Sequence, residues 1–331
     1  MLLSIIIVNY KSSDLVLDCL RSLLGDRDNP LFEVIVVDNA SGDDSRQKIM
    51  SAFPGVRWLA MDDNGGFARG NNEGIRRSHG DTVLLLNGDT LPSPDSVAEC
   101  YRRLTASEYV AAGVQLLNAD GSPQISGMYV MRGGLNYLLP LPYLGSLLKS
   151  FGSLAGVRKP HVAHASEAST APIDVDWING AFLMVKRSAI NKAGLLDEDF
   201  FLFAEEAEWC SRIKKTGRLC IFGDLEVVHL QGETTNQEFG SKGRGYYNLY
   251  DRKGLQIMLS NFVRIRKEFG IGWFLVQLLF YLADVPIFLL GLVFSKRYTL
   301  SQWSGYCKNV GIILRLSPTI LKNKPYFYKV L

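Results

Sequence analysis

Residues 4–9 read Ser-Ile-Ile-Ile-Val-Asn, residues 32–38 read Phe-Glu-Val-Ile-Val-Val-Asp, and residues 82–89 read Thr-Val-Leu-Leu-Leu-Asn-Gly-Asp. Each stretch is a short apolar run that ends on polar side chains. Continuous apolar runs of this length are typical of strands that are covered on both faces, as in parallel sheets. These stretches therefore predict strands at the centre of a mostly parallel sheet.

Amphipathic stretches lie between the predicted strands. They predict helices that begin near Ser12–Asp14 and near Ser41, and further helices over Phe67–Ser78 and Val97–Leu104. Another strand is predicted at Val56–Ala60. Strands that alternate with helices are the pattern of an α/β fold in which helices flank the sheet.

The second part of the chain has a less regular pattern. Residues 121–172 are rich in Gly, Pro and Ser and show little periodicity, which predicts a long excursion or mobile loop. Order is predicted to return at Val175–Lys186, with a helix at Glu205–Thr216 and a strand at Leu219–His229. After about residue 260 the sequence becomes basic and then strongly apolar.

Composition limits the class of protein and its compartment. With Lys+Arg 36 and Asp+Glu 33, the net charge of +3 is too balanced for nucleic acid to be the main partner. The amino-terminal apolar run stops after Val8 and has no basic leader, so we interpret it as a strand and not as a signal peptide. The cysteines form no Cys-x-x-Cys pair and are expected to be free, buried thiols in a reducing compartment; they are Cys19, Cys100, Cys210, Cys220 and Cys307.

Polar side chains stand at the ends of the predicted strands. Asn9, Asp38 and Asn87–Asp89 follow carboxyl ends, which meet along one edge of a parallel sheet and bind ligands there. Asp89 is the kind of oxygen ligand that Mg²⁺ or Mn²⁺ uses when phosphates complete its shell. The structural alternatives are a turn at Asn87–Asp89, and at Asp38 a strand end with an Asx turn and helix cap. His229 ends a later apolar strand, where a histidine is more often structural than a ligand.

The stretch at residues 64–72, Asn-Gly-Gly-Phe-Ala-Arg-Gly-Asn-Asn, is unusual for the start of a helix. Its glycines allow close approach to the backbone, and adjacent asparagines are poor helix formers unless they bind something. It is not a Gly-x-Gly-x-x-Gly motif, and the turn after the first strand contains no glycine. A dinucleotide-dependent oxidoreductase is therefore disfavoured.

Acidic residues open the helix that is predicted to begin at Glu205. Carboxylates in a first helical turn stabilise the helix dipole, which is the structural alternative for Glu205, Glu206 and Glu208. Their aromatic setting, with Phe200–Phe203 and Trp209, instead favours raised pKa values and the role of a general base.

Taken in order, these stretches resemble glycosyltransferase family 2, and within it the rhamnosyltransferase-like branch. The resemblance covers about residues 2–255 and implies a GT-A-type fold, with a nucleotide-binding half at about 1–120 and an acceptor-binding half at about 121–255. Residues 256–331 are then a basic and apolar helical segment. The matching motifs lie at residues 4–10, 36–41, 64–72, 84–90, 177–181, 196–210 and 228–235.

The resemblance also implies how a nucleotide-diphosphate sugar would be held. Asp38 would contact the nucleobase, Asn72 and Gly66 would belong to the nucleoside pocket, and Gly180 would lie against the transferred sugar. Asp89, with His229, would ligate Mg²⁺ or Mn²⁺ on the diphosphate. The positions expected to bind the donor are Asn9, Asp38, Gly66, Asn72, Asn87 and Gly180.

The acceptor side follows from the same resemblance. Trp177 would bind the acceptor, and the Glu205-Glu206 pair matches a family motif whose second acid is the catalytic base. The implied reaction is an inverting displacement with no covalent intermediate, because Glu206 takes the proton of the attacking hydroxyl. Asn87 and Glu206 both stand where the family usually has Asp.

The carboxy-terminal segment Ile271–Phe294 is apolar except for Gln277 and Asp284, and it contains Pro286. About 20 residues can span a bilayer, but an Asp near the centre costs about 2.5–3.5 kcal/mol. Basic clusters also lie on both sides of the segment. We therefore expect an interfacial or re-entrant helix pair, with a buried helical hairpin or a contact between copies of the chain as the alternatives.

The function expected from the sequence is that of an inverting glycosyltransferase on the cytoplasmic side of the cell membrane. It would transfer a sugar, with rhamnose suggested by the branch, to a glycan or lipid-linked acceptor in cell-surface polysaccharide synthesis. A sugar nucleotidyltransferase is a second possibility, although the Val8–Lys11 turn lacks the Gly-rich phosphate loop that it would need. A catalytically inactive nucleotide-sugar-binding scaffold is a third, suggested by Glu206.

Overall fold

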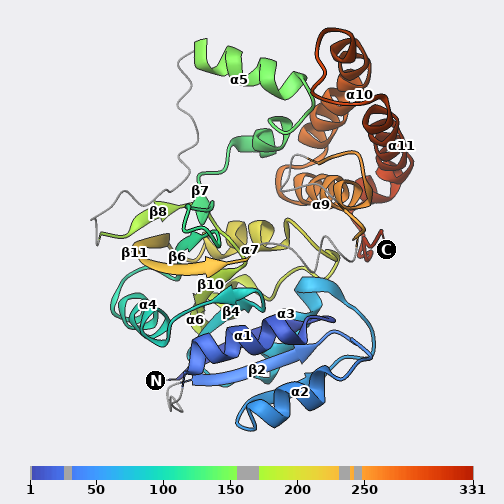
Figure 1. Cartoon of the computed structure of the whole chain (residues 1–331). Coiled ribbons are helices and arrows are strands. Elements are labelled where there is room, and N and C mark those ends of the chain that lie inside the picture. The colour runs from blue at the N-terminus through green and yellow to red at the C-terminus, as the bar shows by residue number, and fades with distance from the viewer. Residues whose placement is uncertain (1, 26–31, 155–170, 231–238, 242–247, 331) are drawn as a thin grey trace. The chain divides into compact units, whose positions relative to one another are not determined.

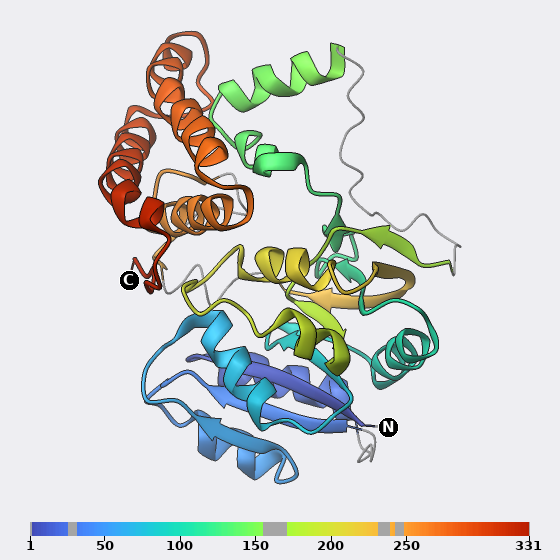
Figure 2. The ribbon, with the colours of Figure 1, turned by 180° about the vertical axis from the view of Figure 1, so that it is seen from behind.

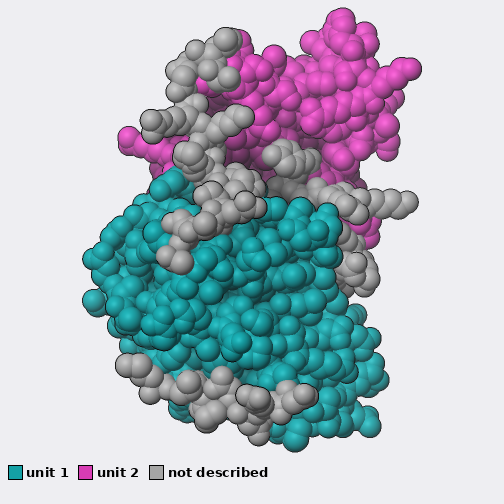
Figure 3. Space-filling model, turned by 60° about the vertical axis from the view of Figure 1, so that its left-hand side comes forward, with its two compact units in different colours: residues 1–129, 161–198, 205–234 teal, residues 130–160, 199–204, 235–331 magenta. Residues whose placement is uncertain are grey.

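The structure is a computed structural model, and it describes residues 2–25, 32–154, 171–230, 239–241 and 248–330. The chain divides into two compact units, which Figure 3 shows in teal and magenta. Unit 1 comprises residues 1–129, 161–198 and 205–234, and unit 2 comprises residues 130–160, 199–204 and 235–331. Each unit has a hydrophobic core of its own.

Unit 1 is built on a nine-stranded mixed sheet in the order β3-β2-β1-β4-β10-β6-β11-β5, with β8 also paired to β11 (Figure 1). Strands β1 to β4 are parallel, and so are β6 and β11, whereas β10, β5 and β8 run antiparallel to their neighbours. The predicted α/β sheet is thus confirmed, with antiparallel strands added in its second half. The strands are β1 (Leu3–Asn9), β2 (Phe32–Asp38), β3 (Arg57–Ala60), β4 (Thr82–Asn87), β5 (Thr90–Leu91), β6 (Ala111–Leu117), β8 (Ile173–Val175), β10 (Phe182–Lys186) and β11 (Leu219–His229).

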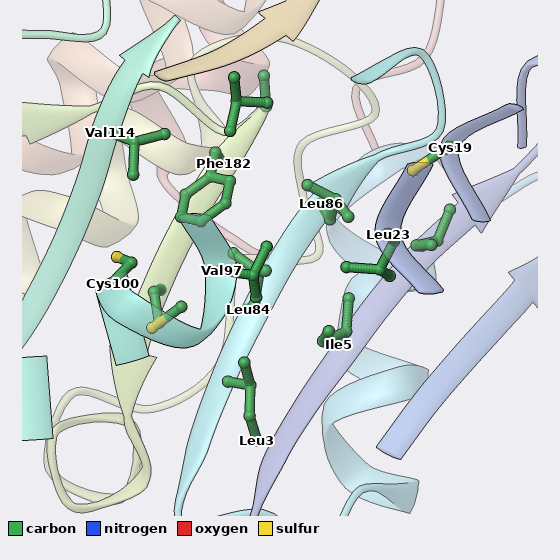
Figure 4. Packing of buried hydrophobic residues seen from close by; sticks show 14 of the residues in the cluster. Leu3, Ile5, Cys19, Leu23, Leu84, Leu86, Val97, Cys100, Val114 and Phe182 are labelled. Atoms are coloured by element: carbon green, nitrogen blue, oxygen red, sulfur yellow. The ribbon is translucent and has the colours of Figure 1, made fainter. Parts of the chain in front are cut away.

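Helices cover both faces of this sheet because its central strands are apolar on both sides. On one face, Ile5 and Leu84 pack against Leu23 and Val97 of the covering helices α1 and α4, as Figure 4 shows. On the other face α3 lies so close to β1 that a Cβ atom at Gly74 would stand 2.4 Å from Ile6 (Figure 2). The helices of unit 1 are α1 (Ser13–Leu24), α2 (Ser45–Ala52), α3 (Gly66–Arg77), α4 (Pro94–Ala106), α6 (Arg187–Ala193) and α7 (Glu205–Ile213).

The stretch 121–172, predicted as a long excursion or mobile loop, is only partly irregular, so the prediction was wrong for several of its residues. β7 (Gly127–Met128) pairs with β9 (Trp177–Ile178), and the 3-10 helix η1 (Arg132–Leu138) and the helix α5 (Leu144–Leu154) follow. These elements are short, and η1 is interrupted by left-handed φ angles of 71° and 72° at its two glycines. No single period therefore runs through the stretch.

Unit 2 is helical. Its core joins η1 and α5 to the long helices α9 (Arg252–Phe269), α10 (Ile271–Phe294) and α11 (Leu300–Lys322). The expected helix pair within Ile271–Phe294 was wrong, because the structure has one helix of 24 residues there that continues through Pro286. A proline removes one backbone hydrogen bond of a helix, and Pro286 lies on the exposed side of α10. The predicted boundary at residue 255 falls inside α9, and the division into functional domains stays a prediction.

The polar side chains of α10 lie on its buried face, and its exposed face is apolar, unlike in an ordinary soluble helix. Its six buried residues, Phe274, Gln277, Leu278, Tyr281, Asp284 and Phe288, include an amide, a phenol and a carboxyl group. Its exposed residues are all apolar, glycine or proline: Ile271, Gly272, Leu275, Val276, Leu279, Leu282, Ala283, Pro286, Leu289, Leu290, Val293 and Phe294. Among the described residues, α10 is the one helix long and apolar enough, by length and composition, to cross a membrane.

The buried polar groups of α10 are only partly hydrogen-bonded: among the described residues, Oε1 of Gln277 and both carboxyl oxygens of Asp284 have no partner. The Nε2 atom of Gln277 donates to the carbonyl oxygens of Gly133 and Gly134, both at 3.3 Å. Burial raises the pKa of Asp284 to about 7. The carboxyl group therefore reaches its neutral form near neutral pH, which lowers the cost of burying it.

All five cysteines are free. Four of them are buried, and Cys307 is half-buried. Burial raises the pKa of the Cys19 and Cys220 thiols to about 12, so these groups are inert at neutral pH. The sequence-based expectation of free thiols is confirmed, with Cys307 less buried than expected.

Candidate active site

The carboxyl ends of four strands bring the predicted site residues to one edge of the sheet. Register places Asn9 of β1 beside Asp38 of β2, and Val8 beside Asn87 of β4. At the other end of the sheet, Thr90 of β5 pairs with His229 of β11. Residues that lie up to 220 positions apart in the sequence therefore share one edge, as the strand-end rule predicted.

At the β1–β2 end of this edge, Asp38 lies in a compact hydrogen-bond network. Its Oδ1 atom accepts from Asn9 Nδ2 at 2.8 Å and from the Ser41 hydroxyl, and its Oδ2 atom accepts from the Ser41 backbone amide at 3.2 Å. The network fixes the turn after β2, where Ala40 has a left-handed φ of 60°. Non-glycine residues in this conformation are concentrated at functional sites and tight turns. The geometry therefore agrees with the turn alternative and leaves contact with a nucleobase as a prediction.

The glycine-containing stretch at residues 64–72 is hydrogen-bonded to the same edge of the sheet. Asn39 donates from Nδ2 to the Gly66 carbonyl at 2.8 Å, and Gly66 has a left-handed φ of 73° that favours glycine. Asn72 lies deeper: it is fully buried, donates to the Leu196 carbonyl at 2.9 Å and accepts from the Leu196 amide at 3.0 Å. Its amide group holds α3 against the segment that precedes α7. A part for Asn72 in the nucleoside pocket stays a prediction.

Asp89 and His229 form the other end of the edge. The Nε2 atom of His229 lies 3.3 Å from Oδ1 of Asp89, and both side chains are at least 86% buried. The Nδ1 atom of His229 lies 2.9 Å from Oε1 of Gln124, whose Nε2 atom donates to the His229 carbonyl. If Nδ1 carries the proton, Gln124 fixes the tautomer that leaves the Nε2 lone pair facing Asp89.

These residues fit a divalent cation of the kind that phosphates help to bind. One carboxylate oxygen and one imidazole nitrogen converge at a largely buried point, and a glutamine orients the imidazole as in known metal sites. The described residues contain no group of three or more His, Cys, Asp or Glu side chains that could hold a metal by themselves. The remaining ligands would have to be phosphate oxygens and water, which is the usual arrangement for Mg²⁺.

The acid pair lies beside the other predicted residues. Glu205 and Glu206 begin α7, and both are buried. The indole Nε1 of Trp177 donates to Oε1 of Glu206 at 3.2 Å. A Cβ atom at Gly180 would lie 3.4 Å from Glu206 and 3.3 Å from the ring of Phe67, so the backbone of this glycine lies close to both side chains. A main-chain hydrogen bond joins this region to the strand that precedes Asp89, because the Asn87 amide donates to the Ala181 carbonyl.

The third acid of the α7 cluster has a different role. Glu208 forms two hydrogen bonds of 2.7 Å with Arg212, one turn further along the helix. Arg212 also donates to the Ala193 carbonyl at the end of α6. Glu208 is therefore a structural acid, and Glu205 and Glu206 are the two that are not committed to this ion pair.

Sequence reasoning missed two features of the site. Gln124 was not selected, because it follows a turn in a stretch without periodicity and lies 105 residues from His229. Trp177 was expected to bind the acceptor, and its hydrogen bond to Glu206 had no signal in the sequence. Both contacts join short elements from distant parts of the chain, which patterns within a short window cannot detect.

The sheet order and the strand-end acids define a GT-A-type protein, and solved structures share this fold. One is the mannosyltransferase PcManGT from Pyrobaculum calidifontis in complex with GDP-Man and Mn²⁺, with a TM-score of 0.52, 17% identity, and coverage of 97% of this chain and 84% of that one. Another is residues 1–349 of S. aureus TarS in complex with UDP-GlcNAc, with a TM-score of 0.51, 14% identity, and coverage of 95% and 81%. At these identities the likeness concerns the fold.

The sequence comparisons name the family. The profile described as Glycosyl transferase family 2 matches residues 4–158. The low-salt glycan biosynthesis hexosyltransferase Agl10 of Haloferax volcanii is 30% identical over 217 residues, which are 64% of this chain and 62% of that protein. The aligned region thus spans less than two thirds of Agl10. Residues 4–158 of the chain therefore match glycosyltransferase family 2.

Two further relatives place the chain near the rhamnosyltransferase-like branch. The N-acetylglucosaminyl-diphospho-decaprenol L-rhamnosyltransferase of Mycobacterium tuberculosis is 26% identical over 254 residues, 71% of this chain and 78% of that protein. The rhamnosyltransferase WbbL of Escherichia coli K12 is 25% identical over 246 residues, 72% of this chain and 86% of that protein. The resemblance inferred from the motifs is therefore confirmed at the level of family and branch.

Proposed function

We propose that this protein is an inverting glycosyltransferase that uses a nucleotide-diphosphate sugar and a divalent cation. The observation that carries the proposal is the convergence of two acidic centres on one edge of a GT-A-type sheet. Asp89 and His229 converge at one end, and Glu206 lies beside the backbone of Gly180. The match of residues 4–158 to glycosyltransferase family 2 supports the same reaction class.

The donor would lie along the strand-end edge, between these two centres. Asn9 and Asp38 would face the nucleotide, with Gly66 and Asn72 at the nucleoside, and Asn87 and Gly180 near the diphosphate and the sugar. Gly180 supports this placement, because a side chain there would press against Phe67 and Glu206. The nucleotide-binding half at about 1–120 and the acceptor-binding half at about 121–255 are part of this proposal.

Glu206 is the proposed catalytic base. Its carboxylate would accept the proton of the acceptor hydroxyl while the oxygen attacks the anomeric carbon from the face opposite the diphosphate. Asp89 and His229 would hold Mg²⁺ or Mn²⁺, which when bound supplies positive charge for the departing diphosphate. Glu205, buried beside Glu206, would help to set the electrostatics of the site.

The acceptor is proposed to be a glycan or lipid-linked saccharide in cell-surface polysaccharide synthesis. The names of the rhamnosyl- and hexosyltransferase relatives support a hexose-type sugar, with rhamnose as our first choice. A lipid-linked acceptor implies that the protein works at the cytoplasmic face of the membrane. The apolar exposed face of α10 supports attachment through residues 256–331.

The test of the proposed function is a thermal-shift screen of nucleotide sugars with and without Mg²⁺ or Mn²⁺, followed by a donor-hydrolysis assay. A bound donor raises the apparent melting temperature by mass action. We expect one or a few nucleotide sugars to stabilise the protein, and only with the metal present. Stabilisation without hydrolysis or transfer would favour the scaffold alternative, and formation of a nucleotide sugar from a sugar phosphate would favour the nucleotidyltransferase.

Trp177 is expected to act as a positioning residue for the base. Trp177→Phe keeps the aromatic ring but removes the hydrogen bond to Glu206, so kcat should fall about tenfold with little change in the KM for the donor. The hydrogen bond from Trp177 stabilises the charged carboxylate of Glu206, so the pKa of Glu206 should rise when this bond is removed. The low-pH side of the pH–rate profile should then shift to higher pH.

A matched control exists on α7. Trp209 makes the same kind of bond, but its Nε1 donates to the Gly194 carbonyl, at 2.8 Å, and not to a carboxylate. Trp209→Phe should lower thermal stability without moving the pH–rate profile. An unchanged profile in Trp177→Phe would assign Trp177 to acceptor binding alone.

A further inference from the structure

The exposed apolar side chains of the protein are concentrated on two helices of unit 2. Of the 16 large hydrophobic residues that are exposed among the described residues, nine lie on α10 and two, Leu147 and Phe151, lie on α5. Phe151 and Phe294 are 67% and 86% exposed. Isolated exposed hydrophobics are common on soluble proteins, but a continuous helix face without one polar group marks an interaction site. We refer to the exposed apolar side chains of α5 and α10 as the apolar surface.

Helix α5 is joined to the end of α10 by specific contacts. The Tyr143 hydroxyl donates to the Ser295 carbonyl at 3.2 Å, and Arg297 donates to the Ser146 hydroxyl at 3.4 Å. A Cβ atom at Gly291 would stand 2.4 Å from the Tyr143 ring, so glycine is needed there for the two helices to meet. Figures 1 and 2 both show α5 beside the end of α10. The apolar surface therefore belongs to one packed body.

The same body carries an excess of positive charge. Residues 130–154 and 271–330 contain nine Lys and Arg residues, all of them exposed, against one acidic residue, Asp284, which is buried. The rest of the chain holds 27 basic and 32 acidic residues, so the opposite balance prevails there. The nine are Arg132, Lys149, Lys296, Arg297, Lys308, Arg315, Lys322, Lys324 and Lys329.

The apolar surface and the exposed cations near it together indicate which partner binds there. Lys149 lies two positions from both Leu147 and Phe151 and therefore on the opposite side of α5, as cations do on an amphipathic helix, and Lys296 and Arg297 follow Phe294 directly. Apolar side chains next to exposed cations fit the boundary between acyl chains and anionic head groups of a bilayer. A second copy of this chain would place like charges opposite each other, which disfavours association.

The neighbours of α10 define how it would meet the bilayer. Helix α11 runs antiparallel beside it, since Trp303 donates to the Val285 carbonyl at 3.0 Å and the Tyr306 hydroxyl donates to the Tyr281 carbonyl at 3.2 Å. If α10 crossed the membrane, α11 would be immersed together with its exposed Lys308 and Arg315. A helix axis in the plane of the membrane keeps these charges in water.

We propose that α5 and α10 together form an in-plane docking surface for a bilayer that contains anionic lipids. The apolar surface enters the acyl boundary, and Lys149, Lys296 and Arg297 contact phosphate groups of the lipids. This inference rests on the membrane attachment in the proposed function and deepens it, because it adds α5 as a lipid-contacting helix and specifies the lipid charge. It does not depend on the catalytic residues.

The test is co-flotation of the full-length protein with vesicles of phosphatidylcholine, alone or mixed with phosphatidylglycerol. We expect at least about tenfold tighter binding to the anionic vesicles and a decrease with added salt. Leu147→Ser combined with Phe151→Ser should weaken binding to both vesicle types at least about tenfold. Replacing Lys149, Lys296 and Arg297 by Gln should remove the preference for anionic vesicles while the weaker binding to neutral ones persists.

Leu314→Ser on α11 is the matched control, because Leu314 is 49% exposed, like Leu147 at 50%, but stands next to Arg315. It should bind vesicles within about twofold of the wild type.

If the α5 double variant fails to fold, Leu290→Ser with Phe294→Ser tests the same surface from α10. Full-strength binding by the α5 variant would overturn the role of α5. A dimer that the same substitutions dissociate, with no vesicle binding, would overturn the proposal. Donor hydrolysis, measured in parallel, reports separately on the proposed function.

Discussion

Glu206→Gln is expected to bind the nucleotide sugar as tightly as the wild type and to transfer the sugar at least about 100-fold more slowly. The amide keeps the size of the side chain but cannot accept the proton of the acceptor hydroxyl. It can still accept the hydrogen bond from Trp177 Nε1, so the local geometry should survive. The measurement is kcat for transfer together with the Kd for the donor from thermal shift or calorimetry.

Three further variants make this result specific. Glu206→Asp shortens the side chain by one methylene but keeps a carboxylate, so it should retain more activity than the amide. Glu208→Gln, in the same helical turn, should affect stability through its bond to Arg212 and leave kcat nearly unchanged. If Glu205→Gln is the inactive variant instead, the roles of Glu205 and Glu206 must be exchanged.

Asp89→Ala is expected to abolish the metal-dependent part of donor binding, with at least about a 100-fold increase in Kd and no loss of fold. The carboxylate is the anionic group that the structure places beside His229, and His229 remains oriented by Gln124 without it. Titrations of the nucleotide sugar with and without Mg²⁺ or Mn²⁺ give the required difference.

Asp81→Ala provides the matching control, because Asp81 precedes the same strand, β4, at its opposite end and bonds to the Tyr101 hydroxyl at 3.0 Å. Its donor affinity should equal that of the wild type. Donor binding that never depended on metal, or that Asp89→Ala leaves intact, would remove the cation site from the proposed function.

The first half of the fold was predictable because its signal is local. The apolar run expected at Ser4–Val8 is β1 at Leu3–Asn9, and the one at Thr82–Leu86 is β4 at Thr82–Asn87. Each of these strands is buried on both faces, so every residue contributes to the pattern. The direction of β10 was not predictable, since an apolar run reads alike in a parallel and an antiparallel strand.

The site was predictable only in part, for a similar reason. The strand-end rule selects Asn9, Asp38 and Asp89 because polar residues interrupt apolar runs at those points. The hydrogen bond between Trp177 and Glu206 depends instead on how β9 packs against α7, which no local pattern encodes. The buried position of Asn72, with its amide bonded to Leu196, also required the tertiary structure.

The interleaved course of the chain through unit 2 has a consequence for synthesis on the ribosome. Residues 130–154 emerge more than 100 positions before α10 and α11, which supply the side chains that cover them. The nascent chain therefore carries Leu138 and Leu141 without their native packing partners until the carboxy-terminal helices arrive. A premature stop would leave this apolar stretch permanently uncovered, and such products should be recognised by chaperones and proteases.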